Sequence, residues 1–494
     1  MTYLIFFFAA VAMMYFLLSS PNKKPPATHD DAKINGKLLR GTRVVGTNHA
    51  AEIVAQRNDK LGATLAGIPI PRDAEVNNFL FQGAPGTGKS LAFIQMLGYA
   101  RQAGHRAVVV DNNADFLRRF YRPGDIILNP FDQRSEAWSP FSEMRNPYDS
   151  MRLAKSIVPD GQGESKVWAS YSQNLISAVL LRLWEKGGSA ATTSEMVRLL
   201  TVSPVEELKA LCAGLPASTL SEEGAERMFA GIRADVGSKL AAFAYLKQGA
   251  GMDSFSLTDF IQKDDKKWVF LSYRDDQFDM LAPLIAAQLD VLISATLSLR
   301  PDPDRRIFFA LDEFATLGKI QSADNLLTKG RKFGASAIIG LQTISQFRSS
   351  YGRDGAQTLL SCLGTSLCLR SPDPDTAETM SKLLGKQEVL RTTESASTGG
   401  TGGGTSSWSQ QVAETFTVMP STLQNLPKCE GYLALVGDYH PARVTVPFPA
   451  PSPDVAPAFV DRDFRAEALA EATARTQAEA TKKLNVLEMT DSLL

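Results

Sequence analysis

The stretch Gly83-Ala84-Pro85-Gly86-Thr87-Gly88-Lys89-Ser90 decides the fold of this chain. It meets the pattern G-x-x-x-x-G-K-[ST], in which backbone N–H groups and a helix N-terminus surround phosphates and the lysine reaches the β- and γ-phosphates. Glycines are needed because a Cβ atom would clash with that close approach. The serine hydroxyl is the expected Mg²⁺ ligand. An apolar strand pattern precedes the motif and a helical pattern follows it, so we predict that all eight residues bind ATP with Mg²⁺.

A second apolar stretch supplies the acids that such a site needs. The run Phe308-Phe309-Ala310-Leu311 ends in Asp312 and Glu313. We expect Asp312 to hold Mg²⁺ and Glu313 to polarise the attacking water as the general base. An ordinary strand end with two solvated acids is the alternative. Because a lone aspartate suits binding whereas the Asp-Glu pair suits hydrolysis, the sequence predicts a P-loop ATPase.

Two more polar residues end apolar strands further along the chain. Gln342 follows the predicted strand at residues 335–340 and is expected to contact the γ-phosphate or the attacking water, with a polar strand cap as the alternative. Arg370 ends the predicted strand at residues 365–370 and is a candidate arginine finger toward a neighbouring subunit. A structural salt bridge is the alternative for Arg370, and Arg331 is a rival for the finger. These residues complete the predicted catalytic set.

Composition limits the classes of protein that fit. The 494 residues are 44% hydrophobic and 21% charged, which indicates a globular chain of two to four domains. The formal net charge of −1 excludes a generally basic DNA binder, so DNA would have to meet a local basic patch or the lining of a pore. Four cysteines lie far apart without a CxxC pair, and four histidines are scattered. This pattern predicts neither a zinc site nor a disulfide framework.

The amino-terminal residues predict a membrane anchor. Residues 3–18 are all apolar or aromatic, and a helix over residues 1–20 would reach ~30 Å, about the hydrocarbon thickness of a bilayer. No basic segment precedes them and no A-x-A cleavage site follows, which disfavours a signal peptide. Lys23 and Lys24 come next, so the positive-inside rule places the bulk of the chain in the cytoplasm. A buried helix of a soluble domain is the alternative.

The remaining pattern predicts how the chain is organised. Apolar residues recur at helical spacing between residues 147 and 246, whereas strand and helix signals alternate before and after, which predicts an α/β domain with a mostly parallel sheet and an inserted all-α domain. Residues 392–410, rich in Gly, Ser and Thr, are expected to form a flexible loop. The predicted parts are a transmembrane anchor (1–20), a juxtamembrane linker (21–40), the nucleotide-binding domain (41–146 and 251–446), the all-α domain (147–250), and a Pro-rich break with a C-terminal tail (447–494).

Five further stretches lie in order along the chain and carry a family resemblance. They are Gly67-Ile68-Pro69-Ile70-Pro71, the run from Phe120-Tyr121-Arg122-Pro123-Gly124 to Asp132, Leu311-Asp312-Glu313-Phe314-Ala315-Thr316-Leu317, Gly330-Arg331-Lys332-Phe333-Gly334, and Leu341-Gln342-Thr343-Ile344-Ser345-Gln346. With these stretches the sequence resembles the coupling-protein ATPases of conjugative type IV secretion, the TraG/TraD-type family, over about residues 40–445.

The resemblance implies a homo-hexameric motor at the inner membrane, with a RecA-like domain and an all-α domain in the cytoplasm. Such motors recruit a DNA–relaxase complex, with the DNA expected to be single-stranded, and pass DNA or protein to the secretion channel. Members usually carry two membrane helices, and the pattern here predicts one. The family's nucleotide-site positions correspond to Lys89, Ser90, Asp312, Glu313, Gln342 and Arg370. Two other functions stay open: an FtsK/HerA-like DNA translocase outside conjugation, and an ATP-binding membrane adaptor that recruits protein effectors.

Overall fold

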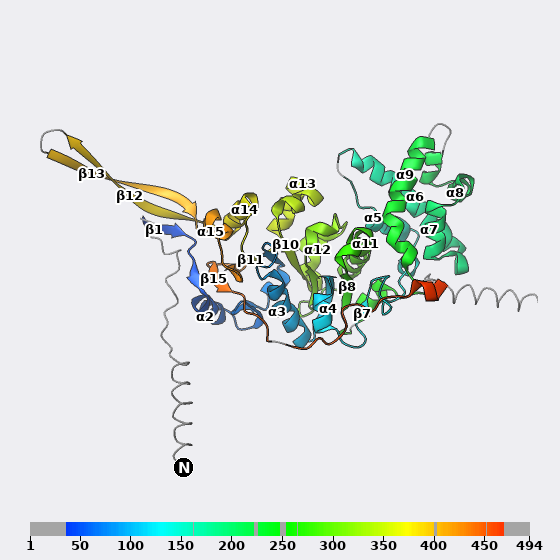
Figure 1. Ribbon diagram of the computed structural model, residues 1–494, viewed down its shortest axis with the longest axis horizontal. Coiled ribbons are helices and arrows are strands. Elements are labelled where there is room, and N and C mark those ends of the chain that lie inside the picture. Colours follow the sequence, from blue (N-terminus) through cyan, green and yellow to red (C-terminus); the bar gives the residue numbers. More distant parts are fainter. Residues whose placement is uncertain are drawn as a thin grey trace, which may run out of the picture.

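The computed structural model describes residues 36–468, apart from short gaps at residues 162, 222–225, 248–252, 264, 400–402 and 451. The predicted anchor at residues 1–20, most of the predicted linker and the tail from residue 469 lie outside the described residues. A central sheet with its covering helices forms the middle of the molecule. A helical lobe lies at one end and a long β-hairpin at the other (Figure 1).

A ten-stranded sheet forms the centre, in the order β2-β15-β14-β11-β5-β10-β9-β6-β8-β7. Neighbouring strands run parallel except for the pairs β11–β14 and β14–β15, so the predicted mostly parallel α/β sheet is confirmed. The order places β10 between β5 and β9. The strands are β2 (Val45–Gly46), β5 (Phe79–Gln82), β6 (Arg106–Asn112), β7 (Ile126–Ile127), β8 (Val269–Tyr273), β9 (Ile307–Leu311), β10 (Ala335–Leu341), β11 (Thr365–Cys368), β14 (Glu430–Ala434) and β15 (Ala442–Thr445).

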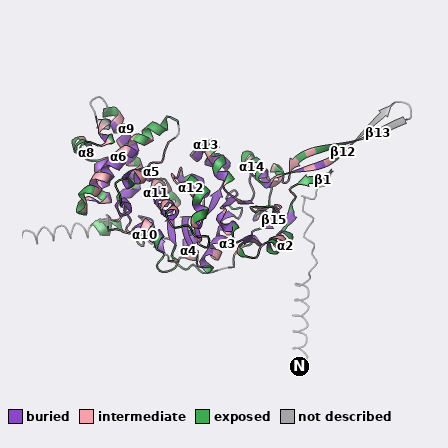
Figure 2. Cartoon of the chain, turned by 180° about the vertical axis from the view of Figure 1, so that it is seen from behind, coloured by how far each residue is buried: buried purple, intermediate pink, exposed green. Residues whose placement is uncertain are grey.

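Helices cover both faces of this sheet, so its central strands are buried throughout (Figure 2). Successive side chains of a strand point to opposite faces. Phe79 and Phe81 therefore pack into one hydrophobic core while Leu80 packs into the other. The first core lies under α2 (Thr47–Arg57), α3 (Lys89–Gln102) and α4 (Asp115–Phe120). The second lies under α10 (Leu257–Gln262), α11 (Phe278–Leu297), α12 (Ala323–Lys329), α13 (Ile344–Ser361) and α14 (Pro374–Leu384).

Helix α11 is unusually apolar. Among the described residues, the stretch Asp275–Leu297 passes the length and composition test for a membrane span. However, 72% of its apolar window is buried inside the chain. Its side chains join the second core, so it is a core helix of the α/β domain.

The helical lobe follows β7 and precedes β8. It contains α5 (Asp149–Ile157), α6 (Ser165–Lys186), α7 (Thr193–Thr201), α8 (Val205–Cys212) and α9 (Glu226–Leu240). The long helix α6 packs against the other four helices, and residues such as Leu175, Val179 and Ile232 are buried. This apolar packing is continuous with the core on one face of the sheet.

The prediction of a loop over residues 392–410 is wrong, because residues 392–399 and 403–410 belong to paired strands. Strands β12 (Lys386–Gly399) and β13 (Gly403–Phe416) pair residue by residue along their whole length. Strand β1 (Gly36–Gly41) adds to the other edge of β12. The Gly-, Ser- and Thr-rich composition offers no packed core, but backbone N–H and C=O groups pair whatever the side chains are, and threonine favours strands. A separate small sheet pairs β3 (Leu61–Leu65) with β4 (Ile68–Pro71), and α15 (Pro420–Gln424) precedes β14.

Candidate nucleotide-binding site

The loop with the G-x-x-x-x-G-K-S pattern connects the carboxyl end of β5 to the start of α3. Its first residues are fastened to the two neighbouring strands. The N–H of Gly83 donates to the carbonyl of Leu341 at 3.1 Å, and the N–H of Ala84 donates to the carbonyl of Arg370 at 3.0 Å. Pro85, Gly86 and Ser90 are exposed, so the rim of the loop faces solvent at the carboxyl edge of the sheet.

Glycines and a threonine shape this loop. Gly86 and Gly88 adopt the left-handed φ values of 72° and 110°, which glycine tolerates without a Cβ penalty. At Gly83 a Cβ atom would lie 2.4 Å from the hydroxyl of Thr87. That hydroxyl donates to the carbonyl of Ala84 at 2.7 Å and closes the loop. The result is a cradle of backbone at the first turn of a helix, which is the arrangement that binds phosphates.

Lys89 and Asp312 meet across this edge. The Lys89 Nζ atom lies 3.0 Å from Asp312 Oδ1, and the two side chains are only 9% and 12% exposed. Asp312 follows β9, two strands away from β5, and Gly340 of the intervening strand β10 leaves room for it. A Cβ atom at Gly340 would lie 2.6 Å from Asp312 Oδ1. The structure therefore brings together the lysine and the acid that the sequence assigns to one phosphate and Mg²⁺ site.

Glu313 and Gln342 also contact each other. The side-chain amide of Gln342 donates through Nε2 to Glu313 Oε1 at 2.5 Å. Glu313 has a left-handed φ of 58°, an uncommon conformation for a residue other than glycine, asparagine or aspartate. Such outliers concentrate at functional sites because the surrounding structure must hold them in place. Gln342 thus holds the carboxylate that was predicted to be the general base.

The two candidate arginines lie at opposite edges of the sheet. Arg370 is half-buried at the carboxyl edge, beside the P-loop of its own chain, and its Nε atom finds no hydrogen-bond partner among the described residues. Arg331 belongs to the turn Gly330–Phe333, which precedes the amino end of β10. Because β5 and β10 run parallel, Arg331 is a full strand length away from its own P-loop.

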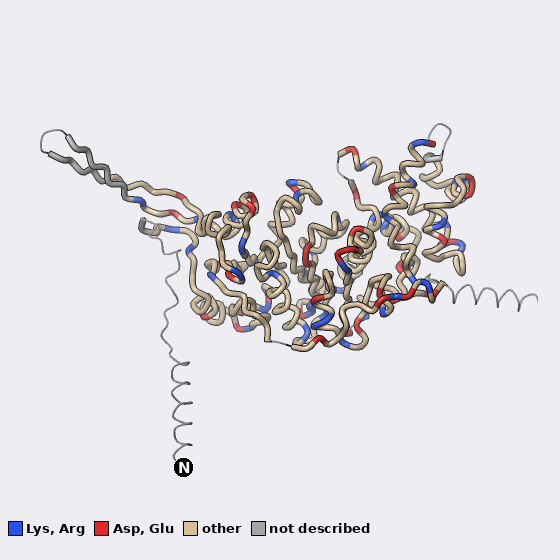
Figure 3. The backbone as a smooth tube through the Cα atoms, viewed as in Figure 1, with Lys and Arg blue, Asp and Glu red and all other residues tan. Residues whose placement is uncertain are grey.

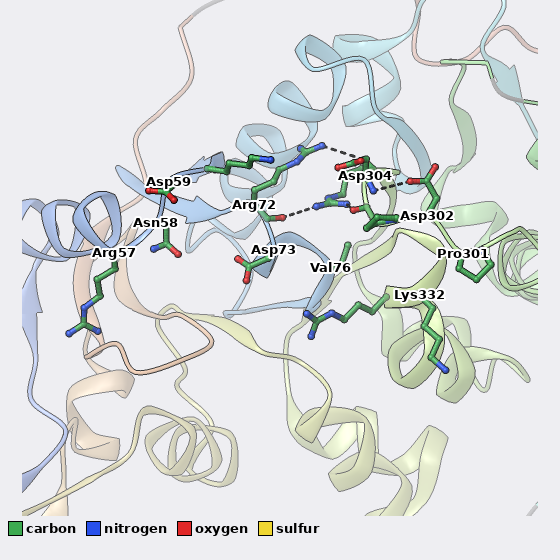
Figure 4. Close-up of a pocket in the computed structure, with 14 residues that line it drawn as sticks. Arg57, Asn58, Asp59, Arg72, Asp73, Val76, Pro301, Asp302, Asp304 and Lys332 are labelled. Atoms are coloured by element: carbon green, nitrogen blue, oxygen red, sulfur yellow. Dashed lines mark hydrogen bonds between the residues drawn. The ribbon is translucent and has the colours of Figure 1, made fainter.

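Arg331 lines a cleft of about 790 Å³ at the amino edge of the sheet (Figure 4). Basic and acidic side chains face this cleft together, with Lys332 and Arg72 among the former and Asp302 and Asp304 among the latter. Because both signs of charge are present, the electrostatic potential in the cleft is not dominated by either sign. The same intermixing of charges runs along the whole described chain (Figure 3).

Asp111 lies on β6, the strand that neighbours β9, and its place in the sequence predicted no role for it. It lies at the carboxyl end of β6, which pairs with β9, and its side chain is fully buried. Burial raises the pKa of Asp111 to about 7, although the backbone N–H groups of Leu117 and Phe116 donate to the carboxyl group and oppose the shift. The signal in the sequence was an aspartate that ends the apolar run of β6, a pattern that Asp312 shares.

A P-loop beside the acids of β9, within a mostly parallel sheet covered by helices, defines the class of α/β nucleotide-binding proteins. Residues 62–447 match the family described as "Type IV secretion-system coupling protein DNA-binding domain". The chain belongs to this family of type IV coupling proteins.

Its relatives agree with that assignment. The chain is 30% identical over 414 residues to coupling protein TraD of Escherichia coli K12, which covers 82% of this chain and 57% of TraD. It is 25% identical over 254 residues to VirD4 of Rhizobium radiobacter, covering 48% of this chain and 36% of VirD4. The chain thus spans little more than half of TraD and about a third of VirD4.

Solved structures of the plasmid coupling protein TrwB are similar in fold. The TrwB complex with the ATP analogue ADPNP superposes with a TM-score of 0.78 at 33% identity, covering 88% of this chain and 99% of that one. The TrwB complex with ADP and Mg²⁺ gives a TM-score of 0.77 at 33% identity, covering 86% and 97%.

Proposed function

We propose that this chain is a membrane-anchored, ATP-driven motor that couples a DNA–relaxase substrate to a type IV secretion channel during conjugative DNA transfer. The observation that carries the proposal is the Lys89–Asp312 ion pair between the P-loop and the end of β9, inside a chain of the coupling-protein family. The TrwB complexes with ADPNP and with ADP and Mg²⁺ support ATP and Mg²⁺ as the ligands of this site.

The residues of the site fit a nucleotide with its metal ion. Gly83 lets the loop close on Thr87, and Gly86 and Gly88 take the left-handed conformation that the loop requires. Lys89 would exchange the carboxylate of Asp312 for the β- and γ-phosphates. Ser90, exposed in the first turn of α3, and Asp312 would hold Mg²⁺. When bound, Mg²⁺ neutralises charge on the phosphates and helps to orient them.

Hydrolysis is assigned to the residues around Glu313. Its carboxylate would accept a proton from the attacking water, a role that contributes about 10²- to 10⁴-fold to the rate of such reactions. Gln342 keeps this carboxylate in place and is the second polar group near the water. Arg370 is proposed to act on the phosphates. Arg331 lies beyond reach of its own P-loop, so in a ring it would act only on the site of a neighbouring subunit.

The cellular setting is proposed from family membership together with the sequence. Residues 1–20 would anchor the chain once in the inner membrane, with the bulk in the cytoplasm. Six copies would form a ring. The RecA-like domains (41–146 and 251–446) would turn over ATP, and the all-α domains (147–250) would meet the substrate. The strand order, with β10 between β5 and β9, supports the RecA-like assignment. Residues 447–494 would form the Pro-rich break and tail. Because charges of both signs are intermixed, single-stranded DNA would meet a local patch in the channel of the ring (Figure 3).

The test combines turnover with transfer. We expect the purified full chain in detergent to hydrolyse ATP faster when single-stranded DNA is added. In a mating assay, the wild-type gene should restore transfer to a strain that lacks it, and Lys89→Ala should not. If DNA transfer persists with Lys89→Ala, the proposal of an ATP-driven motor is overturned. Hydrolysis that no form of DNA stimulates would favour an adaptor of protein effectors, and a gene dispensable for mating would favour a translocase outside conjugation.

A further inference from the structure

Gln82 is the last residue of β5 and directly precedes the P-loop. Its side chain is only 1% exposed. Through Nε2 it donates to the carbonyl of Gln342 at 3.2 Å and to the hydroxyl of Ser371 at 3.1 Å. One buried amide therefore ties the end of β5 to the chain segments that leave β10 and β11.

Both segments carry residues of the candidate site. Gln342 holds the carboxylate of Glu313 through its own side-chain amide. Ser371 follows Arg370, and the backbone N–H of Leu369 donates to the carbonyl of Gln82 at 2.8 Å. A displacement of the Gln82 side chain would therefore remove one tie each from the backbone at Gln342 and from the residue after Arg370, and leave the backbone hydrogen bonds of the strand ends in place.

Packing alone does not explain a glutamine at this position. The other residues of β5 that face the two cores are apolar, as expected for a buried parallel strand. The Oε1 atom of Gln82 is buried and finds no hydrogen-bond partner in the part of the chain that the structure describes. An unpaired buried oxygen is unfavourable, and a methionine of similar length would fill the space without one.

We propose that Gln82 is a positioning residue for ATP hydrolysis, which holds Gln342, and through it Glu313, in register with the P-loop, and which fixes the Arg370 segment through Ser371. This inference rests on the proposed ATPase function. Gln82 touches neither phosphate nor water in this assignment. It determines whether the groups that do so stay within the narrow range of positions that catalysis requires.

The decisive variant is Gln82→Met, which keeps the length and removes the amide. Gln173→Met is the matched control, because Gln173 is also buried and donates through Nε2 to a backbone carbonyl, that of Val158 at 2.8 Å, and to a side-chain oxygen, that of Asp160 at 3.0 Å. Gln173 lies in α6 of the helical lobe. The measurements on the full chain are kcat, the KM for ATP, and Tm.

We expect Gln82→Met to lower kcat by about ten- to a hundredfold, the size of effect that small misplacements produce, and to change KM by no more than about twofold. Gln173→Met, which removes a buried amide with the same two kinds of acceptor, should leave kcat unchanged. A Gln82→Met chain with wild-type kcat would overturn the proposal. So would an equal loss of kcat in both variants, since it would reduce the effect to general destabilisation.

A second comparison tests the route of the effect. If Gln82 acts mainly through Gln342, the double variant Gln82→Met/Gln342→Ala should lose clearly less kcat than the product of the two single losses, and its loss beyond that of Gln342→Ala should be no larger than the loss in Ser371→Ala. Losses that multiply would overturn that route.

A third variant tests the contact with Ser371. Ser371→Ala removes one acceptor of the Gln82 amide with little risk to folding, and it should lower kcat by about threefold or more. A wild-type kcat in this variant would show that the contact between Gln82 and the Arg370 segment does not contribute to hydrolysis. Lys89→Ala separates the two hypotheses: if it is still active, the proposed function fails, whereas an inactive Lys89→Ala beside a fully active Gln82→Met defeats only the role of Gln82.

Discussion

The Lys89–Asp312 ion pair makes a prediction about stability that is separate from catalysis. Lys89→Ala should abolish ATP turnover, because no other lysine or arginine of the P-loop takes its place. The same change also leaves Asp312 without its partner in a site where both side chains are nearly buried. The variant should therefore be less stable than the wild type even when no nucleotide is present.

The size of this loss can be bounded from burial. Removing one partner of a fully buried pair costs about 3–5 kcal/mol, whereas exposed pairs contribute about 0–1 kcal/mol. At 9% and 12% exposure the pair lies near the buried limit. Truncating Lys89 opens a path for water to Asp312, which moves the expected loss to about 2–3 kcal/mol. Adding Asp312→Asn removes the unpaired charge and should restore about half of that loss.

Hydrogen exchange of the backbone amides of α3 is the suitable assay, because a chain with several structural units need not unfold in one step. The opening free energy of these amides should fall in Lys89→Ala and recover partly in Lys89→Ala/Asp312→Asn, while both variants stay inactive. Protection of α3 equal to that of the wild type would refute the reasoning. A double variant less stable than Lys89→Ala would refute it as well.

Other changes test the remaining parts of the site. Glu313→Gln should retain ATP binding by equilibrium titration and lose about 10²- to 10⁴-fold in kcat; a weaker affinity with little change in kcat would contradict the role of general base. Gly83→Ala should abolish nucleotide binding, because its Cβ atom would clash with Thr87 at 2.4 Å, and unchanged affinity would show that the loop relaxes. Arg370→Ala should lower hydrolysis yet leave nucleotide affinity nearly intact, and a main effect on affinity would exclude a finger role. Burial raises the pKa of Asp111 to about 7 from 3.8, so the folded chain binds this proton more tightly than the unfolded chain does, and the stability from Asp111 is lost as pH rises through about 7. Asp111→Asn should therefore flatten the fall in Tm between about pH 4 and about pH 7, and an unchanged pH profile would contradict it.

The sequence predicts the parts of this protein that depend on strand order along the chain and on motif chemistry. Apolar runs bounded by Gly83 and by Asp312 indicate buried parallel strands, and parallel strands present their carboxyl ends at one edge. The meeting of Lys89 and Asp312 at that edge therefore follows from the pattern. Contacts that depend on side-chain direction do not follow from it. The spacing of these residues in the sequence does not indicate that the side-chain amide of Gln82 contacts both Gln342 and Ser371.

Strands without an apolar signature also escape the sequence. β12 and β13 are held by backbone pairing, and their polar composition conceals it. Strand β14 pairs antiparallel with both β11 and β15, and its short apolar run follows a glycine. Asp111 reads like any polar strand end, although its full burial sets it apart.

The pairing of β1 with β12 determines how a mechanical force would travel through the molecule. A pull on Gly36 is carried to Gly41 by the covalent backbone of β1, and the antiparallel pairs from Gly36↔Arg391 to Gly41↔Gln387 couple any displacement of β1 to β12. β12 continues from α14, where Thr376 accepts a hydrogen bond from the N–H of Ile344, two residues after Gln342. A displacement of β1 would thus be passed to β12 and to α14, which contacts the segment that follows Gln342.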